Sequence, residues 1–429
     1  IEENLFFNFS LSETLIKEGF KINPYDPCVA NKDVCGSQFT ICWYVDDLKL
    51  SHVKSEEVTK MINTLESHFG KMNVTRGKSH TYLGIDFEIR NGKVILRMTD
   101  YLKECIHAYG EAINTSATSP ANNGLMSIDE NSFKLDERRK VKFHHITAKL
   151  LHICKRVRLD LQVAVGFLCT RVKNPTEQDW LKLRRVLQYI QGTLDIPRVI
   201  SMDTLNEMDI YIDASHGVHD DKRGQTGGCT KMGSGVLHSR SSKQRINTLS
   251  SCETELVGNS EYLPYSIWLL YFLENQGYKV KKVRLQQDNQ STIKMLKNGR
   301  RSCGKRSRHV EQRFFWISDR LKNHSIEVKY CPTSLMLADF FTKPLQGSLF
   351  RDMRDVAQGN ADYDALTIKY NKSVLDESTD ETKYDEDNQV PISTISDRKE
   401  RVELHKNNNV TKVKNKDIMR TYADIVRGN

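Results

Sequence analysis

Four acidic residues between positions 206 and 347 each lie where the sequence pattern changes, and this arrangement restricts the fold more than any other feature of the chain. Asp213 ends the apolar strand pattern MDIYID, and Asp288 ends a second one, VRLQQD, just before the helical pattern NQSTIKML. Glu255 lies near the start of a long helical pattern, and Asp339 follows the strand pattern SIEVKYC. The sequence therefore predicts an α/β unit in which strand ends and helix starts bring four carboxylates together.

Four carboxylates that lie this close raise one another's pKa and destabilise a fold unless cations neutralise them. Hard divalent ions with oxygen ligands meet this need, so the acids predict a site for two Mg²⁺ ions, with Mn²⁺ as a substitute. Two such ions about 4 Å apart clamp the attacking and leaving oxygens of a phosphodiester. The alternative is that each acid is a turn or cap residue. With 55 acids in the chain, spacing alone does not decide between the two interpretations.

The segments that carry these acids resemble the ribonuclease H region of Copia-type retrotransposon polyproteins. The resemblance runs from about 206 to 347 and includes YIDAS, RGQTGG, SSK, SSCETEL, DNQS and LADFFTKPL. It implies a ribonuclease H-like mixed-sheet domain. It also implies that the catalytic, metal-binding carboxylates are Asp213, Glu255, Asp288 and Asp339.

Two further residues of this region are secondary candidates. Glu253 is the rival of Glu255, and positions two apart on a helix point about 200° away from each other, so only one faces the site. The small apolar pattern that follows Glu255 favours Glu255. His309, in SRHVEQRF, also matches a segment of the family, although a single histidine on a helix is more often structural.

The segment GRRSCGKRSR (299–308) holds five basic residues and no acid. The simplest interpretation is a solvated loop. Beside a carboxylate site, the segment is better explained as a basic patch that binds the phosphates of a nucleic-acid backbone. The candidate nucleic-acid-binding residues are Arg300, Arg301, Lys305, Arg306 and Arg308. The expected partner is an RNA–DNA hybrid or another nucleic acid, which a net charge of +9 permits without requiring it. Other polyprotein products are possible partners, and the oligomeric state stays open.

The first part of the chain has an α+β pattern. Residues 39–53 (FTICWYVDDLKLSHV) predict a strand, a tight turn and a second strand, and Asn91-Gly92 predicts another hairpin. With the amphipathic helix between them, these segments resemble the later part of the palm of a Copia-type reverse transcriptase. The resemblance implies that Asp46 and Asp47 are two of three metal-binding aspartates. No acid before them matches the third, so polymerase activity is expected to be lost.

The chain therefore divides into four expected segments. They are a partial reverse-transcriptase palm (1–115), a helical thumb or connection (116–205), the ribonuclease H-like domain (206–347) and a charged, disordered tail (348–429). Residues 376–387 (DESTDETKYDED) and the sequence after them offer too little apolar surface to offset the entropy of ordering. The chain opens on Ile1 rather than Met, which indicates a piece of a longer protein.

No apolar run approaches about 18 residues, so no membrane span is expected. The scattered cysteines and the absence of a signal-peptide pattern predict an intracellular protein. The Copia-type resemblance implies a place in the cytoplasm, in virus-like particles, or in the nucleus. Two main hypotheses follow. One is a polyprotein fragment whose ribonuclease H hydrolyses RNA in RNA–DNA hybrids with Mg²⁺. The other is a decayed, non-catalytic nucleic-acid-binding remnant. A polymerase completed by a second chain is a third, less favoured, hypothesis.

Overall fold

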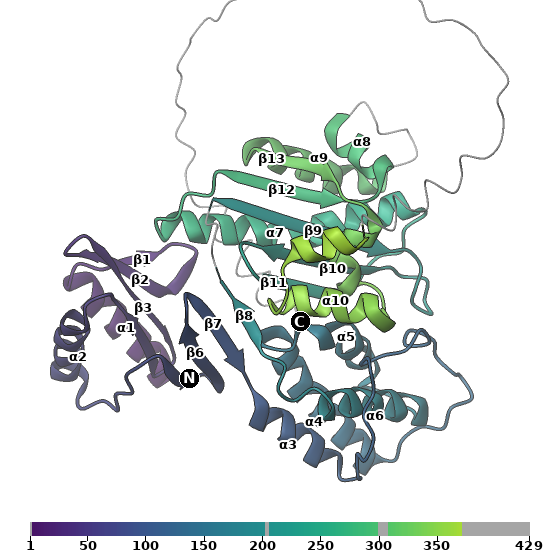
Figure 1. Cartoon of the computed structure of the whole chain (residues 1–429), viewed down its shortest axis with the longest axis horizontal. Helices are drawn as coiled ribbons and strands as arrows, with labels where there is room; N and C mark the ends of the chain where they lie inside the picture. Colours follow the sequence, from purple (N-terminus) through teal and green to yellow (C-terminus); the bar gives the residue numbers. More distant parts are fainter. Residues whose placement is uncertain (1, 202–205, 299–307, 371–429) are drawn as a thin grey trace, which may run out of the picture. The chain divides into compact units, whose positions relative to one another are not determined.

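The computed structural model describes residues 2–201, 206–298 and 308–370, except for the side chains of residues 2–8, 298, 308–312, 314 and 315. Within these ranges the strands form three sheets, which are coloured along the chain in Figure 1. No helix of the described ranges is both long and apolar enough to cross a membrane.

The first sheet is antiparallel, in the order β1-β2-β3-β4, and two helices supply part of its core. Its elements are α1 (Glu2–Lys17), β1 (Lys21–Asn23), β2 (Asp26–Val34), β3 (Ser37–Tyr44), β4 (Asp47–Ser51) and α2 (Ser55–Phe69). The hairpin expected within 39–53 is confirmed: Tyr44 pairs with Asp47, so Val45 and Asp46 make the turn. Val45 has a φ of 58°, which is uncommon for a β-branched residue.

The second sheet has the order β5-β6-β7-β8. Its strands are β5 (Ser79–Tyr82), β6 (Ile85–Arg90), β7 (Lys93–Arg97) and β8 (Arg198–Ile200). The Asn91-Gly92 hairpin is confirmed, with both residues at positive φ, as a tight two-residue turn requires. Because β8 comes from a distant part of the chain and pairs antiparallel with β7, this sheet joins the two segments expected to divide at residue 116.

Helices fill most of the chain between these strands and share one hydrophobic core. They are α3 (Thr99–Tyr109), α4 (Glu137–Arg156), the short η1 (Leu159–Leu161), α5 (Gln162–Arg171) and α6 (Glu177–Gln191). Helix α6 begins at a reciprocal capping box formed by Thr176 and Asp179. The same core includes Tyr211 and Val236 of the third sheet, so these helices and one face of that sheet form one packed body.

The third sheet has the order β11-β10-β9-β12-β13. Its strands are β9 (Glu207–Ser215), β10 (Gln225–Lys231), β11 (Val236–Lys243), β12 (Lys282–Gln287) and β13 (Ile326–Tyr330). Strand β9 pairs antiparallel with β10 but parallel with β12, and β12 pairs parallel with β13. The sheet is therefore mixed, and β9 lies at its centre.

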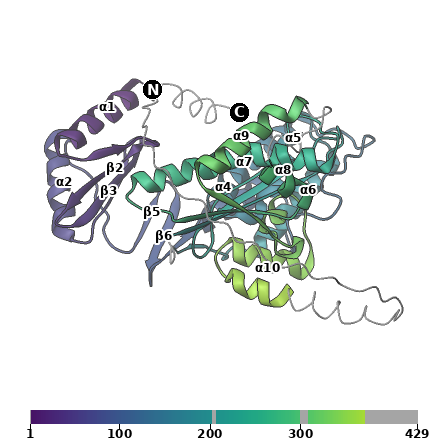
Figure 2. The same ribbon diagram turned by 90° about the horizontal axis from the view of Figure 1, so that it is seen from above.

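Different helices cover the two faces of this sheet. Ile210 and Ile212 of β9 pack in a core with α7 (Ser251–Asn275), α8 (Gln290–Asn298) and α9 (Arg308–Asn323). Tyr211 points the other way, toward the core that contains α5, η4 (Leu337–Phe341) and α10 (Gly347–Ala357). Figure 2 shows α9 and α10 on opposite sides of the strands.

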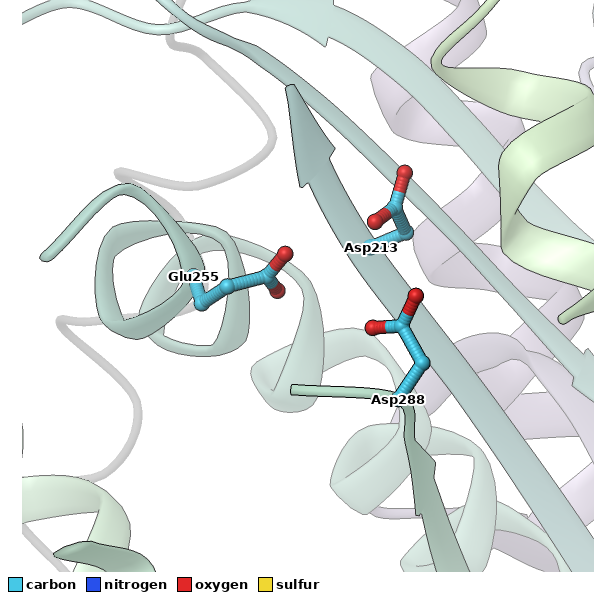
Figure 3. Close-up of side chains that lie close together, drawn as sticks. All are labelled: Asp213, Glu255 and Asp288. Carbon is cyan, nitrogen blue, oxygen red and sulfur yellow. The ribbon is translucent and has the colours of Figure 1, made fainter. Parts of the chain in front are cut away.

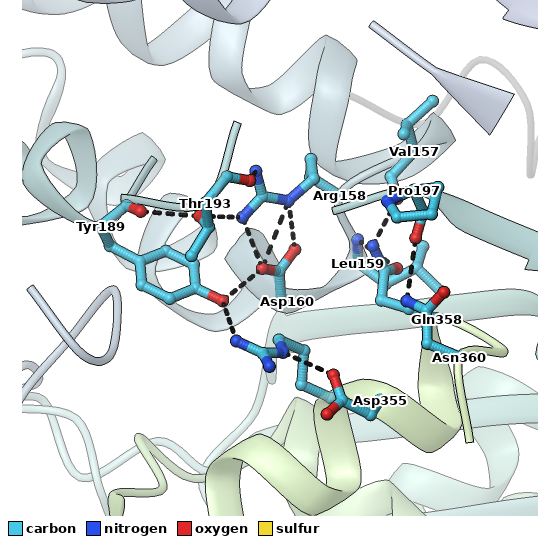
Figure 4. Close-up of polar contacts among 11 residues, drawn as sticks. Val157, Arg158, Leu159, Asp160, Tyr189, Thr193, Pro197, Asp355, Gln358 and Asn360 are labelled. Atoms are coloured by element: carbon cyan, nitrogen blue, oxygen red, sulfur yellow. Dashed lines mark hydrogen bonds and ion pairs between the residues drawn. The ribbon is translucent and has the colours of Figure 1, made fainter. Parts of the chain in front are cut away.

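The prediction of a disordered tail from residue 348 is wrong for residues 348–370. Residues 347–357 form α10 and residues 363–370 are also helical. Phe350, Met353 and Val356 recur every third residue and are buried, a local helical pattern that the composition of the whole tail hides. Just after α10, the amide of Gln358 donates to the carbonyl of Val157, far earlier in the chain (Figure 4). Residues 371–429 lie outside the described residues.

Candidate metal centre

Three acids from three different elements meet at one edge of the third sheet. Asp213 lies near the end of β9, Asp288 directly follows β12, and Glu255 is in the second turn of α7. Each offers one carboxylate oxygen, and these three atoms lie within 4.8 Å of one another. Figure 3 shows the three side chains turned toward the same small space. The parallel pairing of β9 with β12 explains this, because the carboxyl ends of parallel strands share one edge of a sheet.

The three carboxylates are largely buried, and neighbouring residues donate hydrogen bonds to them. Asp213 and Glu255 are buried, at 3% and 4% exposure, and Asp288 is partly buried. Glu255 accepts hydrogen bonds from the backbone N–H of Ala214 and from the side-chain amide of Gln287, each at 3.2 Å. Thr333 donates to Asp288 at 3.2 Å.

This environment disfavours ionised acids. Burial, followed by the charges of Asp213 and Asp288, raises the pKa of Glu255 well above its usual value. Burial and the charge of Asp213 also raise the pKa of Asp288. A divalent cation would reverse both effects, because it stabilises the ionised carboxylates.

Asp339 approaches Asp213 from η4, on the other side of the strand from Glu255. It does not join the three-acid group; instead, Nζ of Lys343 lies 2.7 Å from Oδ1 of Asp339 and 3.7 Å from Oδ2 of Asp213. Burial and the charge of Asp213 raise the pKa of Asp339 to about 8, although Lys343 acts in the opposite direction.

Two residues beside Asp339 were not predicted as site residues. The hydroxyl of Thr342 donates to Oδ2 of Asp213, and Lys343 pairs with both acids. Thr342 and Lys343 follow Asp339 by three and four positions within LADFFTKPL. A helical turn that starts at Asp339 therefore places all three side chains on the same face. That spacing was the signal that could have found them.

Two glycines of β10 allow the elements of the site to approach the sheet. Gly227 pairs with Asp213, and a Cβ atom on Gly227 would lie 2.8 Å from the carbonyl oxygen of Ala338 in η4. A Cβ atom on Gly228 would lie 2.2 Å from the ring of Tyr262 in α7. The missing side chains thus let η4 and α7 pack closely on the two faces of the strand beside Asp213.

Glu253 occupies a different position from Glu255. Its Oε2 accepts a hydrogen bond from the N–H of Leu249 at 2.8 Å, while the side chain of Ser250 accepts from the N–H of Glu253. Glu253 therefore helps to cap the start of α7 and is not in the three-acid group. The geometry favours Glu255, the residue preferred from the sequence.

This chain is similar in sequence to polyproteins that are much longer than itself. No family model matches this chain. It is 25% identical over 358 residues to the retrovirus-related Pol polyprotein from transposon TNT 1-94 of Nicotiana tabacum, covering 80% of this chain and 26% of that protein. It is 25% identical over 332 residues to the transposon Ty1-LR2 Gag-Pol polyprotein of Saccharomyces cerevisiae, covering 73% of this chain and 19% of that one. The chain is a homologue of Ty1/Copia-type Gag-Pol polyproteins. It spans only a minor part of the length of these relatives.

A solved structure also resembles part of this chain. It is that of LC11-RNase H1, isolated from compost, with a TM-score of 0.24 and 13% sequence identity. The match covers 31% of this chain and 91% of that one. At this TM-score the likeness carries no weight.

Of the remaining candidate residues, the structure describes Asp46 and Asp47 in full and does not gather them into a metal site. Asp46 and Asp47 are exposed at the β3–β4 turn, and among the described residues no third acid forms a metal-binding group with them. Arg300, Arg301, Lys305 and Arg306 lie outside the described residues. Arg308 and His309 begin α9, but their side chains are also outside the description, so both stay predictions.

Proposed function

We propose that the third sheet and its helices form a ribonuclease H-like unit that hydrolyses the RNA strand of RNA–DNA hybrids with Mg²⁺. The observation that supports this most is the group of Asp213, Glu255 and Asp288 at the edge of a five-stranded mixed sheet. Homology to Gag-Pol polyproteins agrees with a nucleic-acid substrate.

The residues present suit a hard divalent cation. The donors are carboxylate oxygens without sulfur or imidazole, which is the set that Mg²⁺ and Mn²⁺ prefer. Asp213, Glu255 and Asp288 would hold one ion, and Asp213 with Asp339 would contribute to a second. When bound, such ions make a water more acidic and stabilise charge on a leaving oxygen.

The surrounding residues orient these carboxylates. Gln287 and the N–H of Ala214 fix the two oxygens of Glu255, so that its carboxylate keeps one rotamer. Thr342 fixes one oxygen of Asp213, and Thr333 fixes one oxygen of Asp288. Ligands held in this way need less reordering when a cation binds, which favours binding.

The test is cleavage of a labelled RNA–DNA hybrid by the whole 429-residue chain with Mg²⁺. The whole chain is needed because helices α3 to α6 and α10 share a core with the third sheet. We expect RNA fragments with 5′-phosphates from the parent and no cleavage by Asp213→Asn or Asp288→Asn. Asp220→Asn, the same change at an exposed position, should cleave like the parent.

Cleavage that survives in both site variants would rule out this function, and so would a parent that does not cleave. A parent that binds the hybrid without cutting it would favour the non-catalytic nucleic-acid-binding alternative. We do not expect this chain alone to extend a primer, because Asp46 and Asp47 are exposed and no third acid of the described residues lies with them.

A further inference from the structure

Lys343 divides the acid centre into two unequal halves. Within the described residues, no lysine or arginine forms an ion pair with Glu255 or Asp288, whereas Asp339 shares Asp213 with the ammonium group of Lys343. In the ion pairs of the described residues, Lys343 is the cation that reaches these acids. One half of the centre is therefore already neutralised by the protein, and the other is not.

The exposure of the three side chains shows which of them is free to leave. The carboxylates of Asp213 and Asp339 are 5% and 8% exposed, while the side chain of Lys343 is 39% exposed. A lysine side chain has four rotatable bonds, so its ammonium group can turn into solvent while the acids stay in place. Two cations cannot share the space beside Asp339 without strong repulsion.

We propose that Lys343 is a built-in counter-ion that makes divalent cations bind in order. The first ion binds between Asp213, Glu255 and Asp288, and the second binds between Asp213 and Asp339 only after Lys343 has turned away. The proposal rests on the metal centre of the proposed function and adds a regulator of its second position. Without a divalent ion, Lys343 keeps two buried acids from repelling each other.

The test counts bound ions on the full chain without nucleic acid. Calorimetric titration with Mg²⁺, and electron paramagnetic resonance with Mn²⁺, give the number and affinity of the bound ions for the parent and for Lys343→Met. We expect Lys343→Met to bind the second ion about tenfold more tightly or better. The affinity for the first ion should rise less, because Lys343 is paired most closely with Asp339 and lies farther, at 3.7 Å, from Asp213. Lys343→Arg keeps a cation and should bind like the parent. Lys329→Met removes a lysine of similar exposure that pairs with Glu327 instead, and should also bind like the parent.

A measurement on the parent protein avoids any effect of a variant on folding. The amine of Lys343 should react faster with an acylating reagent, followed by mass spectrometry, once the ion concentration fills the second position. The amine of Lys329 should react at a constant rate.

The outcomes separate this inference from the function on which it rests. If the second ion binds Lys343→Met and the parent equally, or if the labelling of Lys343 does not change as that ion binds, the ordered-binding role is wrong while the metal centre stands. If none of the proteins binds a divalent ion, the proposed function fails together with the inference.

Discussion

Arg158 and Asp160 form an ion pair from which water is fully excluded, with Nη2 and Oδ2 2.7 Å apart and neither side chain exposed. The hydroxyl of Tyr189 in α6 donates to the same oxygen of Asp160 at 2.7 Å, and Arg354 of α10 donates to that hydroxyl at 3.5 Å. Figure 4 shows Arg158, Asp160 and Tyr189 in contact with one another. The network joins η1, α6 and α10, and it explains why the helix after residue 347 is part of the folded body.

Replacing Asp160 with Ala should destabilise the protein strongly. The change leaves the guanidinium of Arg158 buried without its partner, which typically costs about 3–5 kcal/mol. Tyr189→Phe removes one hydrogen bond to the same carboxylate and should cost about 1–2 kcal/mol. Urea unfolding followed by circular dichroism measures both. Asp100→Ala, whose carboxylate is 92% exposed and pairs with Lys103, should change stability by less than about 0.5 kcal/mol. Equal effects of Asp160→Ala and Asp100→Ala would contradict the structural role of the network.

Two glutamates that lie two positions apart should respond differently to the same change. Glu255→Gln removes a carboxylate from the acid group and should abolish cleavage of the hybrid without unfolding the chain. Glu253→Gln changes a cap of α7, so it should retain cleavage and lose only about 0.5–1 kcal/mol of stability. Cleavage rates and urea unfolding of both variants provide the measurement. Loss of cleavage in Glu253→Gln alone would assign the catalytic role to the rival residue.

The close packing of η4 on β10 predicts that Gly227→Ala is harmful. The added methyl group would overlap η4 beside Asp339, and such overpacking typically costs about 1–3 kcal/mol. Because η4 carries Asp339 and Thr342, we also expect slower cleavage. The matched control is Gly166→Ala in α5, where the nearest atom would lie 3.7 Å away. That change should be neutral or stabilise the helix by up to about 1 kcal/mol. Equal stability of the two variants would show that η4 does not pack as described.

Stabilisation by Mg²⁺ should increase with pH. Folding raises the pKa values of Glu255 and Asp288, and it raises the pKa of Asp339 to about 8. The unfolded chain releases these protons near pH 4, so in the metal-free protein the contribution of these three acids to the free energy of unfolding falls as pH rises from about 4 toward 8. A bound cation offsets this loss by stabilising the ionised acids.

Melting temperatures with and without Mg²⁺ at about pH 5.5 and about pH 8 test this expectation. The increase produced by Mg²⁺ should be larger at the higher pH. In Asp213→Asn/Asp288→Asn it should be small at both, because two of the ligands are gone. An increase of the same size at both pH values in the parent would mean that Mg²⁺ binds elsewhere.

Several features of this protein follow from local sequence alone. The Asn91-Gly92 turn depends on neighbouring residues, and the structure confirms this prediction. The capping box of Thr176 and Asp179 is equally local. The acids at 213, 255 and 288 could be predicted as neighbours because strand direction and helix start are visible in the sequence.

Other features depend on contacts between residues far apart in the chain. The pairing of β8 with β7 and the burial of α10 could not be predicted, because local composition does not say which distant surface will cover a segment. The separation of Asp339 from the three-acid group is of the same kind. The sequence by itself determined which acids were candidates for the site. Only the tertiary structure decided that Lys343 forms ion pairs with Asp213 and Asp339, because the direction of a side chain is set by the packing around it.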